Sequence, residues 1–202
     1  RGRAEPAIAP GAAAEVGQGL VTVCLQVART ELGIERVELD VPDTTIGSAG
    51  SSSASRQTWM TGGAVQAACR EVVAELARRA RSLGKALEDV DIGDLLEEPI
   101  DRTATYRHRD TEPRDDATQN HGHVAFLFAA HRATVDVDLG TGLVRVVQIA
   151  TAQDVGKAIN PLAVIGQIEG GIAQGLGLAV MEEIQLRDGR VLNPSFTDYL
   201  LP

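Results

Sequence analysis

The sequence predicts an α/β (α+β) protein in which mixed sheets pack with helices. Its 202 residues are 44% hydrophobic and 23% charged, which is typical of a globular chain with a core. Three stretches carry apolar residues at helical spacing, and other stretches alternate apolar and polar residues as strands do. Both kinds of pattern run along one chain, so we expect helices and sheets to share a core.

Helices dominate the first half of the predicted fold. Apolar residues recur every three or four positions over 20–32, and Gly33 stands where that helix would end. The strongest pattern runs over 58–83 and stops at Gly84, and residues 85–98 predict a short acidic helix. Residues 37–41 alternate as a strand, whereas residues 1–11 have no clear period and are expected to be irregular.

Antiparallel pairs are expected in the second half. The predicted elements are strands at 124–128, 133–139 and 143–149, a helix at 162–181, and a hairpin of 183–186 with 190–192. Residues 140–142 would turn the first hairpin, and Asp188-Gly189 would form a type I′ turn in the second. We therefore expect three parts: residues 1–98, a polar connecting excursion at 99–121, and residues 122–202.

Charge and cysteine content exclude several classes of protein. The net charge of −9 disfavours nucleic-acid and anionic-membrane partners, because both would be repelled. The longest apolar stretch, 168–181, falls short of the ~20 residues of a membrane span, so no transmembrane helix is expected. Cys24 and Cys69 form neither a disulfide framework nor a zinc motif, which favours a reducing, cytoplasmic location.

Two helix starts offer sites for an anion. Gly17, Gln18 and Gly19 precede the first helix, where a ligand could approach the backbone N–H groups; a tight turn is the other interpretation. Ser55, Arg56, Gln57 and Thr58 begin the second helix, and their hydroxyls, N–H groups and cation suit a phosphate or pyrophosphate. In the alternative interpretation Ser55 only caps the helix and Arg56 is solvated.

A third candidate site lies in the second half. Asp154 and Asn160 sit in a loop before a helix that is unusually rich in glycine, including Gly166. Glycines inside a helix indicate close approach, either by another helix or by a flat cofactor that Gln167 would contact. His121 and His123 form a His-x-His pair that could ligate a metal, although surface or turn histidines are the simpler interpretation and no metal ligand is expected.

Together these motifs resemble the molybdenum-binding large subunit of the xanthine dehydrogenase/aldehyde oxidase family. The similarity is strongest to bacterial xanthine dehydrogenases whose molybdenum subunit is a separate polypeptide. The matching stretches are EVGQGLVTVCLQVA (15–28), DTTIGSAGSSSASRQTWMTGGAV (43–65), FLFAAHRATVDVDLGTGLVRV (126–146), DVGKAINPLAVIGQIEGGIAQGLG (154–177) and GRVLNPSFTDYLLP (189–202).

The resemblance implies a molybdopterin cofactor with molybdenum, in the cytosine dinucleotide form of bacterial enzymes. Residues 17–19 would lie near the molybdenum and the pterin, and residues 55–58 would hold the pyrophosphate or nucleotide. The second half would add contacts from Asp154, Asn160, Gly166 and Gln167. The outer two parts of the chain would then be two cofactor-binding subdomains.

The family implies an activity as well. Its members oxidatively hydroxylate an electron-poor carbon of a purine, such as xanthine or hypoxanthine, or of an aldehyde, and pass electrons through [2Fe–2S] clusters to FAD and NAD. Those clusters need four cysteines each and this chain has two, so iron–sulfur and FAD subunits would be partners. The remaining part of the molybdenum subunit would be another partner, and a homo-oligomer stays open.

The resemblance also implies that this chain is a catalytically incomplete piece of a longer protein. The family's catalytic base, a Glu in a Gly-Glu motif, would follow Pro202, and most substrate contacts would come from a domain before Arg1. No catalytic residue is expected within 1–202. Three alternatives stay open: a non-enzymatic cofactor-binding or assembly module, an aldehyde- or carbon monoxide-oxidising member of the superfamily, and a nucleotide-dependent transferase that uses the Ser-rich helix start.

Overall fold

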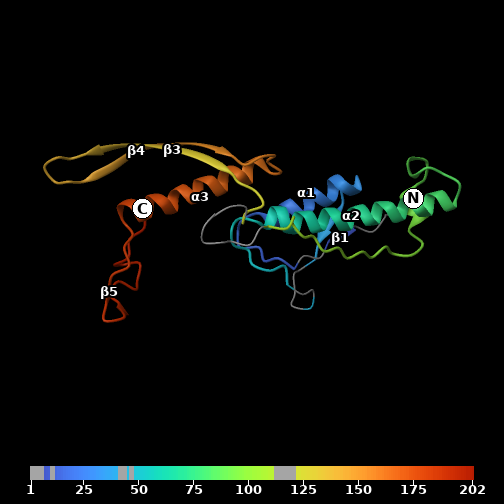
Figure 1. The fold of residues 1–202 in the computed structure, drawn as a ribbon, viewed down its shortest axis with the longest axis horizontal. Coiled ribbons are helices and arrows are strands. Elements are labelled where there is room, and N and C mark those ends of the chain that lie inside the picture. The colour runs from blue at the N-terminus through green and yellow to red at the C-terminus, as the bar shows by residue number, and fades with distance from the viewer. Residues whose placement is uncertain (1–6, 10–11, 41–44, 46–47, 112–121) are drawn as a thin grey trace. The chain divides into compact units, whose positions relative to one another are not determined.

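A computed structural model describes most of the chain (Figure 1). The described residues are 7–9, 12–40, 45, 48–111 and 122–202. The chain divides into two compact units, residues 1–124 (unit 1) and 125–202 (unit 2). The three-part division expected from the sequence stays a prediction, and residues 112–121 of its polar excursion lie outside the described residues.

Unit 1 is built on a short parallel strand pair and two long helices. Its elements are β1 (Ala7–Ala9), α1 (Leu20–Leu32), β2 (Val37–Leu39), α2 (Gln57–Ser82) and the 3₁₀-helices η1 (Leu87–Asp89) and η2 (Ile92–Leu95). Strand β1 pairs in parallel with β2, so α1 is the crossover between them. The expectation that residues 1–11 are irregular is therefore wrong for β1, because its partner lies far along the chain.

Helices α1 and α2 pack side by side in Figure 1 and enclose the core of unit 1. Val65 of α2 touches two buried clusters, one around Cys24 and one around Ala28. An ion pair adds to this contact, since the Glu31 carboxylate of α1 accepts hydrogen bonds from Gln66 and Arg70 of α2. The predicted helices are confirmed here, because their apolar faces bury each other.

The C-terminal part of α2 holds the segment that follows it. Leu76 and Ala80 bury Leu95 of η2, and Arg79 donates to the carbonyl oxygens of Leu95 at 2.7 Å and Glu98 at 2.9 Å. The single helix expected over 85–98 is instead two short 3₁₀-helices. Tertiary contacts to α2 fix this segment, and they override the local helical preference.

Unit 2 contains two hairpins and one helix. Its elements are β3 (Phe128–Val137), β4 (Val144–Asp154), α3 (Pro161–Val180), β5 (Leu186–Arg187) and β6 (Arg190–Val191). The three strands expected between 124 and 149 are two long ones, paired antiparallel with a bulge at Thr134/Val135. The Asp188-Gly189 turn is confirmed, because both residues have the positive φ (48° and 74°) that a type I′ turn needs.

Almost all of unit 2 is exposed or half-buried. Gly177 and Asn193 are the buried residues of this unit. Asn193 accepts a hydrogen bond from the N–H of Gln185 and donates to the carbonyl of Glu183, which ties the β5–β6 hairpin at its base. Unit 2 therefore depends on local hydrogen bonds, whereas unit 1 has a hydrophobic core.

Helix α3 corrects the sequence-based statement about membrane spans. It is 20 residues long, and its most apolar 18-residue window has a mean hydropathy of 1.2 with 6% of that window buried. By length and composition it could cross a membrane. The apolar stretch 168–181 underestimates the length of this helix, because α3 begins at Pro161, well before Ile168. Core helices of water-soluble proteins pass the same test, and it is weak evidence for a membrane.

Replacing Leu76 by Ala tests the α2 core. Leu76 is 7% exposed, and we expect Leu76→Ala to lower the free energy of unfolding of unit 1 by about 2–5 kcal/mol. Leu83→Ala, at a position 56% exposed and just past the end of the same helix, is the matched control and should change it little. Urea unfolding followed by the fluorescence of Trp59, the one tryptophan of the sequence, measures both variants. Equal losses would contradict the packing described.

The Glu75 ion cluster predicts a pH dependence. Hydrogen bonds first from Arg78 and then from Arg79 lower the pKa of Glu75 to about 2. The ordinary pKa in the unfolded chain is about 4.3, so this stabilisation is complete above that pH and is lost as the pH falls toward 2. The urea midpoint of unfolding should fall less between pH 5 and pH 3 in Glu75→Gln than in wild type. In Glu71→Gln it should fall as much as in wild type. A Glu75→Gln profile parallel to wild type would contradict the ion cluster.

Candidate functional site

The turn before α1 is closed by a carboxylate of its own. One oxygen of Glu15 accepts hydrogen bonds from the N–H groups of Gly17 at 2.7 Å and Gly19 at 3.1 Å, and the other accepts from Val21 at 3.0 Å. Gly17 and Gly19 have φ of 100° and 82°, a region that favours glycine. The N-terminal partial charge of α1 is therefore neutralised from within the chain.

Glu15 stays ionised in this arrangement. Burial raises the pKa of Glu15, but the hydrogen bonds from Val21, Gly19 and Gly17 together hold it below its usual value. Gln18 also bonds to this turn, accepting from the N–H of Val16 at 2.6 Å and donating to the carbonyl of Ala14 at 2.9 Å. The signal that sequence reasoning missed is the acidic residue two positions before Gly17.

The loop before α2 has an uncommon backbone. Ala54 and Ser55 adopt φ of 59° and 51°, in the left-handed region that non-glycine residues enter at a cost. The interpretation of Ser55 as the helix cap is wrong, because the N-cap residue is Arg56 and no side chain caps this end. The left-handed φ of Ser55 does not match the extended backbone that N-cap residues typically have. Arg56 turns back instead and donates from Nε to the carbonyl of Ser51 at 2.7 Å.

Gln57 ties the same loop to the core. Its side chain is 5% exposed, donates to Ser51 and Ser52, and accepts from the hydroxyl of Thr61. Its amide therefore has a structural role. Thr58 is exposed, and its hydroxyl makes no hydrogen bond within the described part of the chain.

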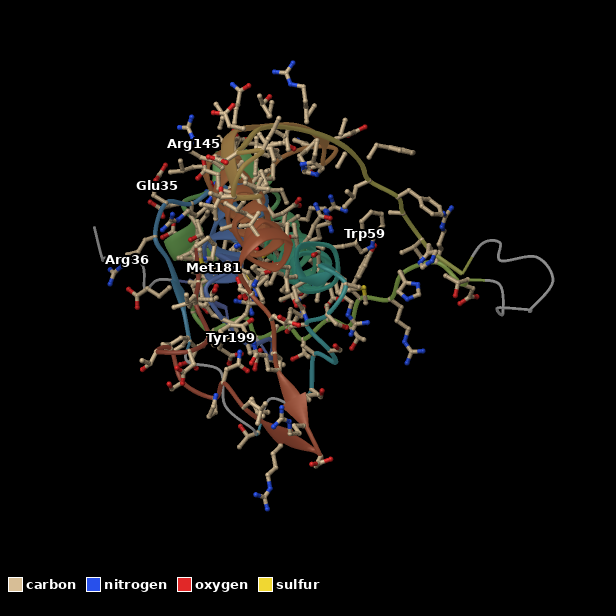
Figure 2. The ribbon with its side chains drawn as sticks, turned by 90° about the vertical axis from the view of Figure 1, so that its left-hand side faces the viewer. Glu35, Arg36, Trp59, Arg145, Met181 and Tyr199 are labelled. Atoms are coloured by element: carbon tan, nitrogen blue, oxygen red, sulfur yellow. The ribbon has the colours of Figure 1, made fainter. Side chains whose placement is uncertain are left out.

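The first turn of α2 retains unused hydrogen-bond donors. The first backbone bond of this helix is from Met60 to Arg56 at 2.9 Å. Among the described residues, the N–H groups of Gln57, Thr58 and Trp59 have no acceptor, and Trp59 is half exposed (Figure 2). Backbone donors, the helix dipole and the Arg56 cation therefore meet at this end, which is the arrangement that binds anions.

A small apolar cavity links the two helix starts. About 70 Å³ in volume, it is bordered by Glu15 and Leu20 at the start of α1 and by Thr61 in the first turns of α2. Cofactor sites occupy about 300–1,000 Å³, so this cavity does not hold one. Instead it shows that Glu15 and Thr61, which bonds to Gln57, border one packed region.

In unit 2, two of the predicted site residues hold their own loops. Asp154 accepts from the N–H of Gly156 at 3.0 Å, and Asn160 caps α3 by accepting from Ala163 at 3.2 Å. Both contacts order the turn into α3. The helix start expected near residue 162 is thus confirmed, with Pro161 in its first turn.

The glycines of α3 face open space. A Cβ atom at Gly166, Gly170, Gly171 or Gly175 would meet no atom within 4 Å in the described structure, and Gln167 is exposed. Within unit 2 itself, no second helix packs against these glycines. Gly177 differs, because a Cβ there would overlap the carboxylate of Glu182.

Metal ligands and paired thiols are absent from the described residues. No group of three His, Cys, Asp or Glu side chains in that part of the chain could hold a metal. His123 is described, whereas His121 lies outside the described residues. Cys24 and Cys69 are buried free thiols, and burial raises the pKa of each.

The predicted site residues fall into two groups. Residues 17–19 and 55–58 belong to unit 1, and Asp154, Asn160, Gly166 and Gln167 belong to unit 2.

Known proteins share both the sequence and the fold. Residues 11–202 match the family model for the molybdopterin cofactor-binding domain. The chain is 33% identical over 194 residues to aldehyde oxidase 4 of Cavia porcellus, covering 93% of this chain and 14% of that protein. It is 30% identical over 206 residues to one subunit of a probable xanthine dehydrogenase of Bacillus subtilis strain 168, covering 93% and 28%.

Among solved structures, quinoline 2-oxidoreductase from Pseudomonas putida 86 matches with a TM-score of 0.75 and 26% identity, over 96% of this chain and 28% of that one. The predicted α/β class is thereby confirmed. The chain spans less than a third of the length of these relatives.

Proposed function

Because the chain belongs to the molybdopterin cofactor-binding domain family, we propose that it holds part of a molybdopterin cofactor in a molybdenum-dependent hydroxylase. The match over residues 11–202 confirms the resemblance drawn from the sequence motifs. The observation that carries the proposal is the first turn of α2, with its unused donors beside Arg56.

The α2 start fits the phosphate-bearing part of such a cofactor. Three N–H groups without acceptors among the described residues, the helix dipole and a guanidinium all favour an oxyanion. The buried amide of Gln57 holds Ser51 and Ser52, so the loop is ordered before any ligand arrives. We assign the phosphate contacts to Ser55, Arg56, Thr58 and the backbone N–H of Gln57.

The α3 helix fits a flat group. Its glycines leave one stretch of backbone uncovered, and Gln167 offers both a donor and an acceptor there. We assign Gly166 and Gln167 to contacts with the cofactor's ring or its nucleotide, while Asp154 and Asn160 hold the preceding loop.

The α1 start does not fit a phosphate. Its N–H groups at Gly17, Gly19 and Val21 already bind the ionised Glu15, whose charge would repel a second anion. We therefore assign residues 17–19 to an uncharged part of the cofactor, where Gln18 can supply amide hydrogen bonds.

Molybdopterin, when bound, supplies the molybdenum redox centre, and the residues of this chain bind and orient it. We propose a purine as the substrate, hydroxylated oxidatively, with electrons passing to [2Fe–2S] and FAD partner subunits. The relatives that match this chain are named as dehydrogenases and oxidases, which favours an enzyme over a non-enzymatic module.

An aldehyde is the second candidate substrate, because the 33% identical relative is named an aldehyde oxidase. We also propose the cytosine dinucleotide form of the cofactor, a cytoplasmic location, and assembly with the remaining part of the molybdenum subunit.

Replacing Arg56 tests the phosphate site. In the full-length protein, Arg56→Ala should weaken cofactor retention by about ten- to a hundredfold, since a hydrogen bond to a charged group contributes roughly 1.5–3 kcal/mol. Molybdenum content and the fluorescence of oxidised, released pterin measure this loss. Arg36→Ala is the control, because Arg36 is an exposed cation that pairs with the exposed Glu38. Equal cofactor content in all three proteins would refute the assignment.

The 202-residue chain alone should not turn over substrate. Supplied with molybdopterin, an electron acceptor and either xanthine or an aldehyde, it should give no product, because the resemblance places the catalytic base outside residues 1–202. The full-length protein with its partners should hydroxylate one of the two substrates. Turnover by the 202-residue chain would contradict the absence of a catalytic residue from it.

A further inference from the structure

Two side chains of the turn from Ala14 to Val21 bond to its own backbone. Glu15 accepts from three backbone N–H groups, those of Gly17, Gly19 and Val21. Gln18 takes one N–H, that of Val16, and one carbonyl. The two side chains therefore share the polar groups of one short turn.

Releasing these two side chains has different consequences. Without Glu15, three N–H groups lose their acceptor at once, and two belong to glycines, whose backbone has many alternative conformations. Without the Gln18 contacts, one N–H and one carbonyl are released, and water can replace the amide at Val16, which is 76% exposed. Glu15 therefore holds more of the backbone of this turn than Gln18 does.

Glu15 is also placed where the turn joins the core. It borders the 70 Å³ cavity together with Leu20 and Cys24, both buried in unit 1. The carboxylate thus holds the turn at the point from which α1 runs into the α1–α2 interface. The two ends of the turn are held by Ala13 and Leu20, which are buried together with Cys24, and Glu15 holds the backbone between them.

We infer that Glu15 is a positioning residue: its carboxylate fixes the backbone of residues 16–21 so that the Gln18 amide can turn toward the cofactor. The role of Gln18 in this inference rests on the proposed function. The role of Glu15 in holding the turn does not. Glu15 contacts neither cofactor nor substrate in this account, and it is no catalytic base.

Hydrogen exchange in the full-length protein tests the backbone role. In Glu15→Ala, the amides of Gly17, Gly19 and Val21 should exchange about tenfold faster, measured on peptides that span 14–23. Glu15→Gln keeps one acceptor oxygen and should retain protection at Gly17 and Gly19 but not at Val21. If Glu15→Ala does not fold, Glu15→Gln alone tests whether the carboxylate holds this backbone. Glu71→Gln, at an exposed position of α2, is the control. Unchanged exchange in Glu15→Ala and Glu15→Gln would overturn the inference.

Kinetics test whether Glu15 acts through Gln18. Glu15→Ala and Gln18→Ala should each lower kcat about tenfold with little change in KM, and the double variant should lower it no further. Effects that multiply would show that the two residues act separately and would overturn the positioning role. If the wild-type protein holds no molybdopterin, the proposed function fails, while the exchange experiment still decides the role of Glu15 in the turn.

Discussion

Whether the backbone N–H groups at a helix start of unit 1 already have an acceptor decides what that start can bind. At α1, the Glu15 carboxylate takes the N–H groups of Gly17, Gly19 and Val21, so the chain supplies its own anion. At α2, the N–H groups of the first turn have no acceptor among the described residues, and Arg56 adds positive charge. Two similar Gly- and Ser-rich motifs are therefore electrostatically opposite.

The packing of unit 1 supports this difference. Helices α1 and α2 bury Cys24, Ala28 and Cys69 between them, and Glu31 ties the two helices through Gln66 and Arg70. The loop before α2 is held by the buried Gln57, which bonds to Thr61 beside the same cavity that Glu15 borders. In unit 2, local caps and turns order the chain, and the glycine-bearing backbone of α3 stays uncovered.

Sequence patterns predicted the elements whose determinants are local. Apolar spacing located α1 and α2, the helix expected over 162–181 is α3, and Asp188-Gly189 specified the second hairpin. Strand β1 was missed, because its only partner among the described strands is β2, across an intervening helix. Ser55 was mistaken for a possible cap, and the role of Glu15 was missed, since both depend on backbone angles that composition does not reveal.

The most direct measurement of the central claim is an experimental structure of the full-length protein with its cofactor bound. Our account requires phosphate density within hydrogen-bonding distance of the N–H groups of residues 57–59 and of Arg56, with Glu15 still bound to Gly17 and Gly19. Phosphate at the start of α1 in place of the Glu15 carboxylate, or a cofactor remote from both α2 and α3, would contradict it.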